Sequence, residues 1–305
     1  MELVIGVDGG GTRTRLVVAA ADGRILGLGE AGCGNPSAGG EAEVRGSLAA
    51  ARTRAFVQAG LEPRAAAAAF LGLAGVAGEE ERRAVERLAV ELELAPGDRT
   101  AVDHDLRVAQ AGAFAGGPGL VLVAGTGSAC YGRAADGRSW RAGGGGSFAD
   151  DGGSAFDLGR RALAACLRAR DGRGPRTALE GAVSRATGGE ELRSLLGRLG
   201  PRGEARAEVA RLAPLVAEAA ADGDEVARAI LAAGAGELAE AAAAVARALG
   251  EEEPAIALVG GALPPGGAYH RAVESALRDH LPAVQLTSPR LTPAGGAVLL
   301  AIELL

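Results

Sequence analysis

Short apolar runs separated by glycine turns open the chain. Residues 2–8, 14–20 and 24–30 are each of strand length and rich in valine, leucine and isoleucine. Three glycines at 9–11 separate the first run from the second, and Asp22-Gly23, before the third, is typical of a hairpin turn. The pattern therefore predicts three consecutive strands joined by tight turns.

A helical period follows these strands. Apolar residues at Val44, Leu48, Ala51 and Ala55 recur at spacings of three and four, which predicts a helix over 37–59 that ends at Gly60. The remaining elements expected in this part are strands at 67–73 and 100–102 and helices at 79–92 and 106–114.

The same order of features begins again after Gly116-Gly117-Pro118-Gly119. Apolar runs again flank a glycine turn, now at 125–128, and Asp136-Gly137 marks a second hairpin. Such a repeat predicts two related halves, and strands that alternate with helices indicate the α/β class. The second half is expected to contain strands at 120–124, 130–133, 139–141, 255–259 and 284–287, a mostly helical region at 154–249, and a helix at 269–280.

The length of the chain agrees with two domains. It has 305 residues, and a single hydrophobic core stops growing at about 250–300 residues. We place an N-terminal domain at 1–115 and a C-terminal domain at 116–292. A closing helix over 293–305 is expected to return to the N-terminal domain.

Composition and charge exclude several classes of protein. Hydrophobic residues make up 48% of the chain, which excludes a disordered protein. All 32 basic residues are arginines, so neither a P-loop nor a Schiff-base lysine can be present. The net charge of −6 disfavours nucleic acid as the main ligand.

Cysteine usage and the N-terminal pattern indicate a cytoplasmic protein. Cys33, Cys130 and Cys166 are far apart and form no CxxC pair, so we expect neither a disulfide framework nor a zinc knuckle. The first residues resemble no signal peptide. No uncharged apolar run reaches about 18 residues, so no membrane association is expected.

Two glycine turns are candidates for phosphate binding. Asp8-Gly9-Gly10-Gly11-Thr12 follows the first strand, and Gly125-Thr126-Gly127-Ser128 follows the corresponding strand of the second half. Glycines permit close approach of the backbone, and successive N–H groups can hold an anion. Either turn alone also suits a structural hairpin, but two in matching positions favour phosphate binding. A third turn, Gly260-Gly261, suits close packing beside a nucleotide.

Several carboxylates are candidates for acid–base chemistry. Asp105 stands where a short strand meets a helix, and a carboxylate there can take a proton from a substrate hydroxyl. A helix N-cap is the alternative role at such a junction, and Asp151, which precedes a long helix, has the same alternative. His104 is assigned no role. Asp103, Asp150 and Asp157 are further candidates.

The motifs in this order resemble the N-acetylglucosamine kinases and the BadF/BadG/BcrA/BcrD-type ATPases, within the superfamily of actin, sugar kinases and heat-shock chaperone ATPases. The resemblance extends from Ile5 to the closing helix. It implies two ribonuclease-H-like domains of the actin/hexokinase type, with ATP and sugar in an interdomain cleft. It also implies phosphorylation of the 6-hydroxyl of an amino sugar, N-acetylglucosamine or glucosamine, with ATP as donor and Mg²⁺. The motifs are 8–14, Asn35, Asp105, 125–128, 151–154 and Gly260-Gly261.

The resemblance also implies a role for individual residues. Asp105 would be the catalytic base and Asp8 would lie near Mg²⁺. The implied sugar contacts are Asn35, Asp105, Ser128, Gly144, Gly145, Gly146 and Asp151. The implied phosphate and nucleotide contacts are Gly10, Gly11, Thr12, Gly125, Thr126, Ala220 and Gly260.

The chain departs from the family at two places. It has Gly144-Gly145-Gly146 where the family often has Gly-Trp-Gly, which changes the fit to the sugar. Asp150 adds a carboxylate where glycine is common, and extra negative charge favours an amine over an acetamide. Glucosamine is therefore a second expected substrate.

Two other functions share this fold. One is the ATPase activator of a 2-hydroxyacyl-CoA dehydratase, which holds an iron–sulfur cluster through cysteines. Cys130 and Cys166 are candidates here, but the cysteine-rich surroundings of that family are absent. The other is a non-catalytic ATP-driven switch, against which Asn35 and Asp105 favour catalysis on a sugar. Apolar helix surface at 205–249 is sufficient for a homodimer.

Overall fold

The polypeptide forms two compact units. A computed structural model describes residues 1–199 and 206–305. Unit 1 consists of Met1–Gly119 together with Ser288–Leu305, and unit 2 consists of Leu120–Thr287. The helix at the end of the chain therefore belongs to unit 1.

Unit 1 is built on a five-stranded mixed sheet. The first three strands form the predicted antiparallel meander, and the next two lie parallel to β1 on its other side. Their carboxyl ends consequently meet at one edge of the sheet, where Asp8, Gly72 and Asp103 are aligned across β1, β4 and β5. The strands, in spatial order, are β3 (Ile25–Ala31), β2 (Thr14–Ala20), β1 (Leu3–Gly9), β4 (Ala68–Leu73) and β5 (Thr100–His104).

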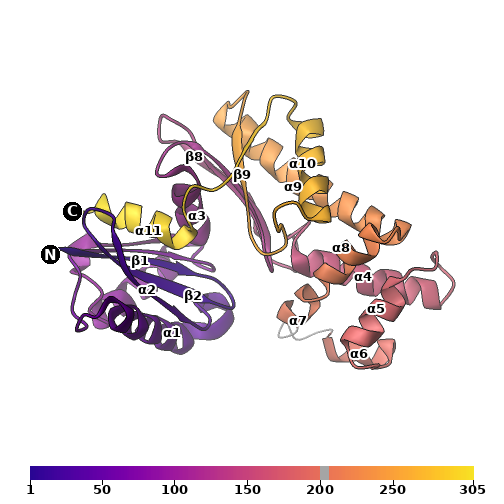
Figure 1. Ribbon diagram of the computed structural model, residues 1–305, viewed down its shortest axis with the longest axis horizontal. Helices are drawn as coiled ribbons and strands as arrows, with labels where there is room; N and C mark the ends of the chain where they lie inside the picture. The colour runs from indigo at the N-terminus through magenta and orange to yellow at the C-terminus, as the bar shows by residue number, and fades with distance from the viewer. Residues whose placement is uncertain (200–205) are drawn as a thin grey trace. The chain divides into compact units, whose positions relative to one another are not determined.

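Helices cover both faces of this sheet (Figure 1). Alternate side chains of the strands enter two separate cores: Ile5 packs with α1 and α2, and Val4 packs with α3 and α11. The predicted periodic face of α1 is buried and Gly60 ends that helix in a left-handed conformation. The helices are α1 (Pro36–Ala59) and α2 (Glu79–Glu91) on one face, α3 (Asp105–Phe114) and α11 (Pro293–Ile302) on the other, with a 3₁₀ turn, η1, at Gly97–Arg99.

Gly72 permits α3 to approach the sheet closely. A Cβ atom at this position would lie 2.4 Å from Cγ2 of Val108, which is far inside van der Waals contact. Val108 is fully buried. The absence of a side chain on β4 therefore helps to place α3, and with it Asp105, against the sheet edge.

The sheet of unit 2 repeats the strand order of unit 1. Here β6 takes the place of β1, the antiparallel pair β7–β8 lies on one side, and β9 and β10 run parallel to β6 on the other. This repetition confirms the expectation of two related ribonuclease-H-like halves. The strands, in spatial order, are β10 (Gln285–Thr287), β9 (Ala255–Val259), β6 (Gly119–Ala124), β7 (Ser128–Arg133) and β8 (Ser139–Gly143).

Helices make up a large part of unit 2. They share one large core with the sheet, in which α9 packs against β7, β8, α8 and α10. The predicted helical region 154–249 includes 200–205, which lie outside the described residues, as does the first residue of the expected dimer surface at 205–249. The helices are α4 (Ala155–Arg170), α5 (Leu179–Ala186), α6 (Leu192–Leu199), α7 (Arg206–Ala210), α8 (Ala213–Ala221), α9 (Glu225–Leu249) and α10 (Ala268–His280).

Helix α9 has the length and apolar character of a membrane span, the one such helix among the described residues. In its most apolar stretch, 56% of the residues are buried inside unit 2. Its packing against two strands and two helices is that of a core helix.

Candidate functional site

Asp8 and Asp105 form a carboxylate pair in unit 1. Asp8 lies at the end of β1, and Asp105 is the first residue of α3, directly after β5. Burial and the negative charge of Asp105 raise the pKa of Asp8 from 3.8 to about 6, although Arg15 acts in the opposite direction. Two carboxylates that interact at the end of parallel strands are suited to bind a cation and to accept a proton.

The glycine turn after Asp8 adjoins this pair. The N–H of Gly10 donates to the carbonyl oxygen of Arg13 at 2.8 Å, and the carbonyl oxygen of Gly10 accepts from Gly34 N–H at 2.9 Å. Gly11 and Thr12 are exposed, and a Cβ on Gly11 would meet no atom within 4 Å. The turn is thus closed on itself while its tip remains accessible to a ligand.

His104 serves as the N-cap of α3, a role that sequence reasoning missed. Its Nδ1 accepts a hydrogen bond from the backbone N–H of Arg107 at 3.1 Å. Asp103 accepts the N–H of His104 at 2.8 Å and lies 3.6 Å from Arg82. The capping role considered for Asp105 is therefore filled by the preceding histidine, and Asp105 Oδ1 accepts the N–H of Leu106 at 3.0 Å.

Asn35 lies at the same edge and caps α1. Its Oδ1 accepts the N–H groups of Ser37 at 2.9 Å and Ala38 at 3.2 Å. A Cβ on Gly75, which follows β4, would lie 2.1 Å from that oxygen. The side-chain amide nitrogen of Asn35 makes no hydrogen bond within the described chain, so it can still donate to a ligand.

The second glycine turn is fixed by Asp151 in unit 2. Asp151 is 3% exposed and adopts a left-handed backbone conformation with φ of 65°. Its Oδ1 accepts the N–H of Ser128 at 3.2 Å, and Ser128 Oγ donates to the carbonyl oxygen of Gly152 at 2.7 Å. The structure therefore brings Ser128 and Asp151, both expected sugar contacts, to the Gly125–Ser128 turn.

Arg206 also reaches this turn, although no sequence motif singled it out. It begins α7, 55 residues after Asp151, and forms an ion pair with the carboxylate of Asp151. Such a long separation along the chain leaves no local pattern from which the contact can be predicted.

Gly260 packs against the strand that leads into the turn. Its backbone has φ of 118°, and a Cβ there would lie 2.3 Å from the carbonyl oxygen of Ala124. The N–H of Ala262 donates to the same oxygen at 3.0 Å. The close packing expected of the Gly260-Gly261 turn is therefore present next to Gly125.

Asp150 organises the loop that contains Gly144, Gly145 and Gly146. Its Oδ2 accepts the N–H of Gly145 at 3.1 Å, and its own N–H donates to Gly146 at 2.8 Å. Neither Asp150 nor Asp151, for which a capping role was considered, caps α4, because Ser154 Oγ accepts the N–H of Asp157 in that role. The Asp150 carboxylate thus stabilises a glycine loop, and Phe148 in the same loop is fully exposed.

Ala220 is placed elsewhere in unit 2. It is buried in α8, and its carbonyl oxygen accepts from Arg228 Nε at 3.1 Å. No contact among the described residues connects it with the Gly125–Ser128 turn. Its role at the nucleotide stays a prediction.

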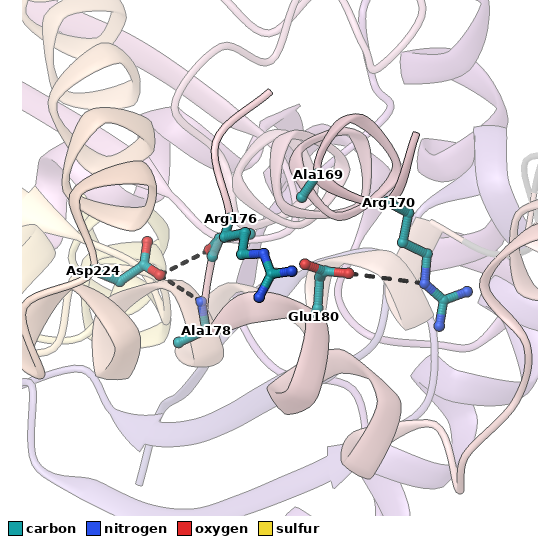
Figure 2. Close-up of a pocket in the computed structure, with 7 residues that line it drawn as sticks. Ala169, Arg170, Arg176, Ala178, Glu180 and Asp224 are labelled. Carbon is teal, nitrogen blue, oxygen red and sulfur yellow. Dashed lines mark hydrogen bonds and ion pairs between the residues drawn. The ribbon is translucent and has the colours of Figure 1, made fainter. Parts of the chain in front are cut away.

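A polar cavity of about 580 Å³ lies among the helices of unit 2. Figure 2 shows Asp224, at the start of α9, opposite Arg176 and Glu180. Oδ2 of Asp224 accepts hydrogen bonds from a hydroxyl and a backbone N–H of the segment just before α5. Arg170 and Glu180 are 3.9 Å apart at the other side. None of the predicted site residues lines this cavity.

The three cysteines are free and buried. Cys130 and Cys166 belong to the hydrophobic core of unit 2. Burial raises the pKa of both thiols, that of Cys166 to about 11. Thiols in such surroundings are poorly suited to hold an iron–sulfur cluster at a subunit interface, which argues against the dehydratase-activator alternative.

Known proteins resemble this chain over nearly its whole length. N-acetylmuramic acid/N-acetylglucosamine kinase from Clostridium acetobutylicum is 30% identical over 303 residues, 99% of this chain and 98% of the relative. N-acetyl-D-glucosamine kinase from Dictyostelium discoideum is 27% identical, with 99% and 98% covered. A solved Chromobacterium violaceum structure, provisionally named an N-acetylglucosamine kinase, is 34% identical, with 99% of both chains covered and a TM-score of 0.79.

The family expected from the motifs is confirmed by a match that includes both units. The sequence pattern that defines the family matches residues 5–301 of this chain. This range contains both glycine turns and the Asp8–Asp105 pair. The chain belongs to the BadF/BadG/BcrA/BcrD ATPase family.

Proposed function

We propose that this protein is an ATP-dependent kinase that phosphorylates the 6-hydroxyl of an amino sugar, N-acetylglucosamine or glucosamine. Its membership of an ATPase family supports ATP as the phosphoryl donor. The two curated relatives named as kinases of N-acetylated amino sugars support the substrate class.

The observation that carries this proposal is the Asp8–Asp105 pair beside an open glycine turn. Phosphoryl transfer depends on the positions of donor and acceptor and on neutralised charge, with little covalent participation by the protein. Asp105 would accept the proton of the sugar hydroxyl as that oxygen attacks the γ-phosphate. The exposed N–H groups at Gly11 and Thr12 would bind phosphate oxygens.

The carboxylate of Asp8 is suited to be a ligand of Mg²⁺. Mg²⁺ is commonly held by one or two carboxylates together with substrate phosphates and water. The raised pKa of Asp8 shows that its charge is costly in the free protein, and a divalent cation at this carboxylate would remove that cost. When bound, Mg²⁺ would supply neutralisation of phosphate charge.

The remaining predicted residues receive roles in each unit. In unit 1, the side-chain amide of Asn35 would donate to the sugar. In unit 2, Gly125 and Thr126 would bind phosphate, and Gly260 and Ala220 would lie near the nucleotide. Ser128, Asp151 and the loop of Gly144, Gly145 and Gly146 would contact the sugar.

A panel of acceptors tests this proposal. Purified protein, ATP and Mg²⁺ are incubated with glucosamine, N-acetylglucosamine, N-acetylmuramic acid or glucose, and ADP release is followed. We expect release to depend on an amino sugar, with NMR showing phosphate on oxygen 6 of the product. ADP release at the same rate without any sugar would contradict the kinase function and favour an ATP-driven switch.

The cytoplasmic location of the protein stays a prediction.

A further inference from the structure

Arg206 places its guanidinium directly against the Gly125–Ser128 turn. Its Nη2 atom is ion-paired with Oδ2 of Asp151, whose other oxygen accepts the N–H of Ser128. A Cβ atom added to Gly127 would lie 2.7 Å from Nη2 and 2.9 Å from Asp151 Oδ1. The absence of a side chain at Gly127 therefore makes room for the arginine.

Unused hydrogen-bond donors remain at this place. Arg206 Nε is buried and has no hydrogen-bond partner among the described residues, which is a costly state for a charged group. The N–H groups of Thr126 and Gly127 also make no hydrogen bond within the described ranges, whereas Gly125 N–H donates to Gly127 inside the turn at 2.8 Å. Free backbone N–H groups beside a guanidinium are suited to bind an anion.

The composition of the chain restricts a side-chain cation at this place to arginine. The sequence contains no lysine, so only arginine can supply a permanent side-chain cation. Arg160 and Arg161, near the start of α4, are both ion-paired with Asp157 at 2.7 Å. Within residues 1–199 and 206–305, Arg206 is the arginine that contacts the turn itself.

We propose that Arg206 is a catalytic residue that binds the terminal phosphates of the nucleotide at the Gly125–Ser128 turn. This inference rests on the proposed kinase function. Asp151 engages Nη2 and fixes the orientation of the planar guanidinium, while Nη1 supplies donors to phosphate oxygens. The positive charge stabilises the phosphoryl group during transfer, as arginines do in other phosphoryl-transfer enzymes.

Nucleotides that differ only in their phosphates test this assignment. Binding of ATP, ADP and AMP to the wild type, Arg206→Gln and Arg206→Lys is measured by calorimetry with Mg²⁺. Arg160→Gln, which removes another arginine–aspartate pair of unit 2, is the matched control. We expect Arg206→Gln to weaken ATP binding about 10- to 100-fold and leave AMP binding unchanged. Arg206→Lys should lie between it and the wild type.

Kinetic constants distinguish phosphate binding by Arg206 from a purely structural role, in which Arg206 only holds Asp151 in place. If Arg206 touches phosphate, kcat and the KM for ATP change while the KM for the sugar stays near the wild-type value. A change in the sugar KM alone, or equal weakening of ATP and AMP, would overturn the proposal. If Arg206→Gln does not fold, wild-type ATP affinity and kcat in Arg206→Lys would overturn it as well. A wild type that binds ATP but phosphorylates no sugar would refute the kinase function instead, and the nucleotide series would still test Arg206.

Discussion

Gly125→Val separates a phosphate-binding turn from a structural hairpin. A Cβ on Gly125 would meet no heavy atom within 4 Å, and the backbone there is not in the left-handed region. The free protein should therefore accept the substitution with a change in stability within about 0.5 kcal/mol. A bound phosphate would be displaced, because a side chain prevents close approach to the backbone.

The expected loss is confined to the nucleotide. Hydrogen bonds to a charged group contribute about 1.5–3 kcal/mol, so losing one should raise the KM for ATP by roughly 10- to 150-fold. Gly236→Val is the matched control, since a Cβ on Gly236 in α9 also meets no atom within 4 Å. Thermal unfolding and steady-state kinetics are measured for both variants.

Two results would refute this reasoning. If Gly125→Val lowers the unfolding temperature but leaves the KM for ATP unchanged, the turn is structural. If Gly236→Val raises the KM for ATP equally, the effect is not specific to the turn. An unchanged unfolding temperature with a raised KM at Gly125 alone would support phosphate binding.

Three further substitutions test the carboxylates and the asparagine. Asn35→Ala should raise the sugar KM about 5- to 150-fold through a lost hydrogen bond, with the ATP KM nearly unchanged; equal changes in both constants would contradict this. Asp8→Asn should stabilise the magnesium-free protein at pH 8 but not at pH 3.5. The pKa of Asp8 is raised from 3.8 to about 6 in the folded protein, so the ionised carboxylate destabilises the fold at pH 8, whereas at pH 3.5 the group is protonated in the folded protein and the cost is nearly absent. The full shift corresponds to about 3 kcal/mol, and partial exposure reduces the expected gain to about 1 kcal/mol; equal unfolding temperatures of variant and wild type at pH 8 would contradict it. Asp150→Gly should shift the ratio of kcat/KM values toward N-acetylglucosamine over glucosamine, since a nearby negative charge favours the amine; an unchanged ratio would limit Asp150 to its observed bond with Gly145.

The periodic elements could be predicted because each follows from a local pattern. The strand before Asp8, the hairpin at Asp22-Gly23 and the buried face of α1 depend on residues close together in sequence. Asp105 was placed correctly at a strand–helix junction for the same reason.

The contacts that complete the candidate site depend on tertiary packing instead. The cap by His104 was missed because histidine is an uncommon N-cap residue and the usual candidate, Asp105, follows it. The approach of Arg206 to Asp151 requires the fold of several intervening helices. The hydrogen bond from Gly145 N–H to the Asp150 carboxylate depends on a compact glycine loop, whose conformation no local pattern predicts.

The measurement that tests the central claim most directly is a single-turnover assay of Asp105→Asn with ATP, Mg²⁺ and the preferred amino sugar. General-base catalysis contributes about 10²- to 10⁴-fold, and we predict that the rate of phosphoryl transfer falls by that factor. ATP affinity should remain close to that of the wild type, because the amide preserves the shape of the side chain. A variant that transfers phosphate at a near-normal rate would contradict the assignment of Asp105 as the base.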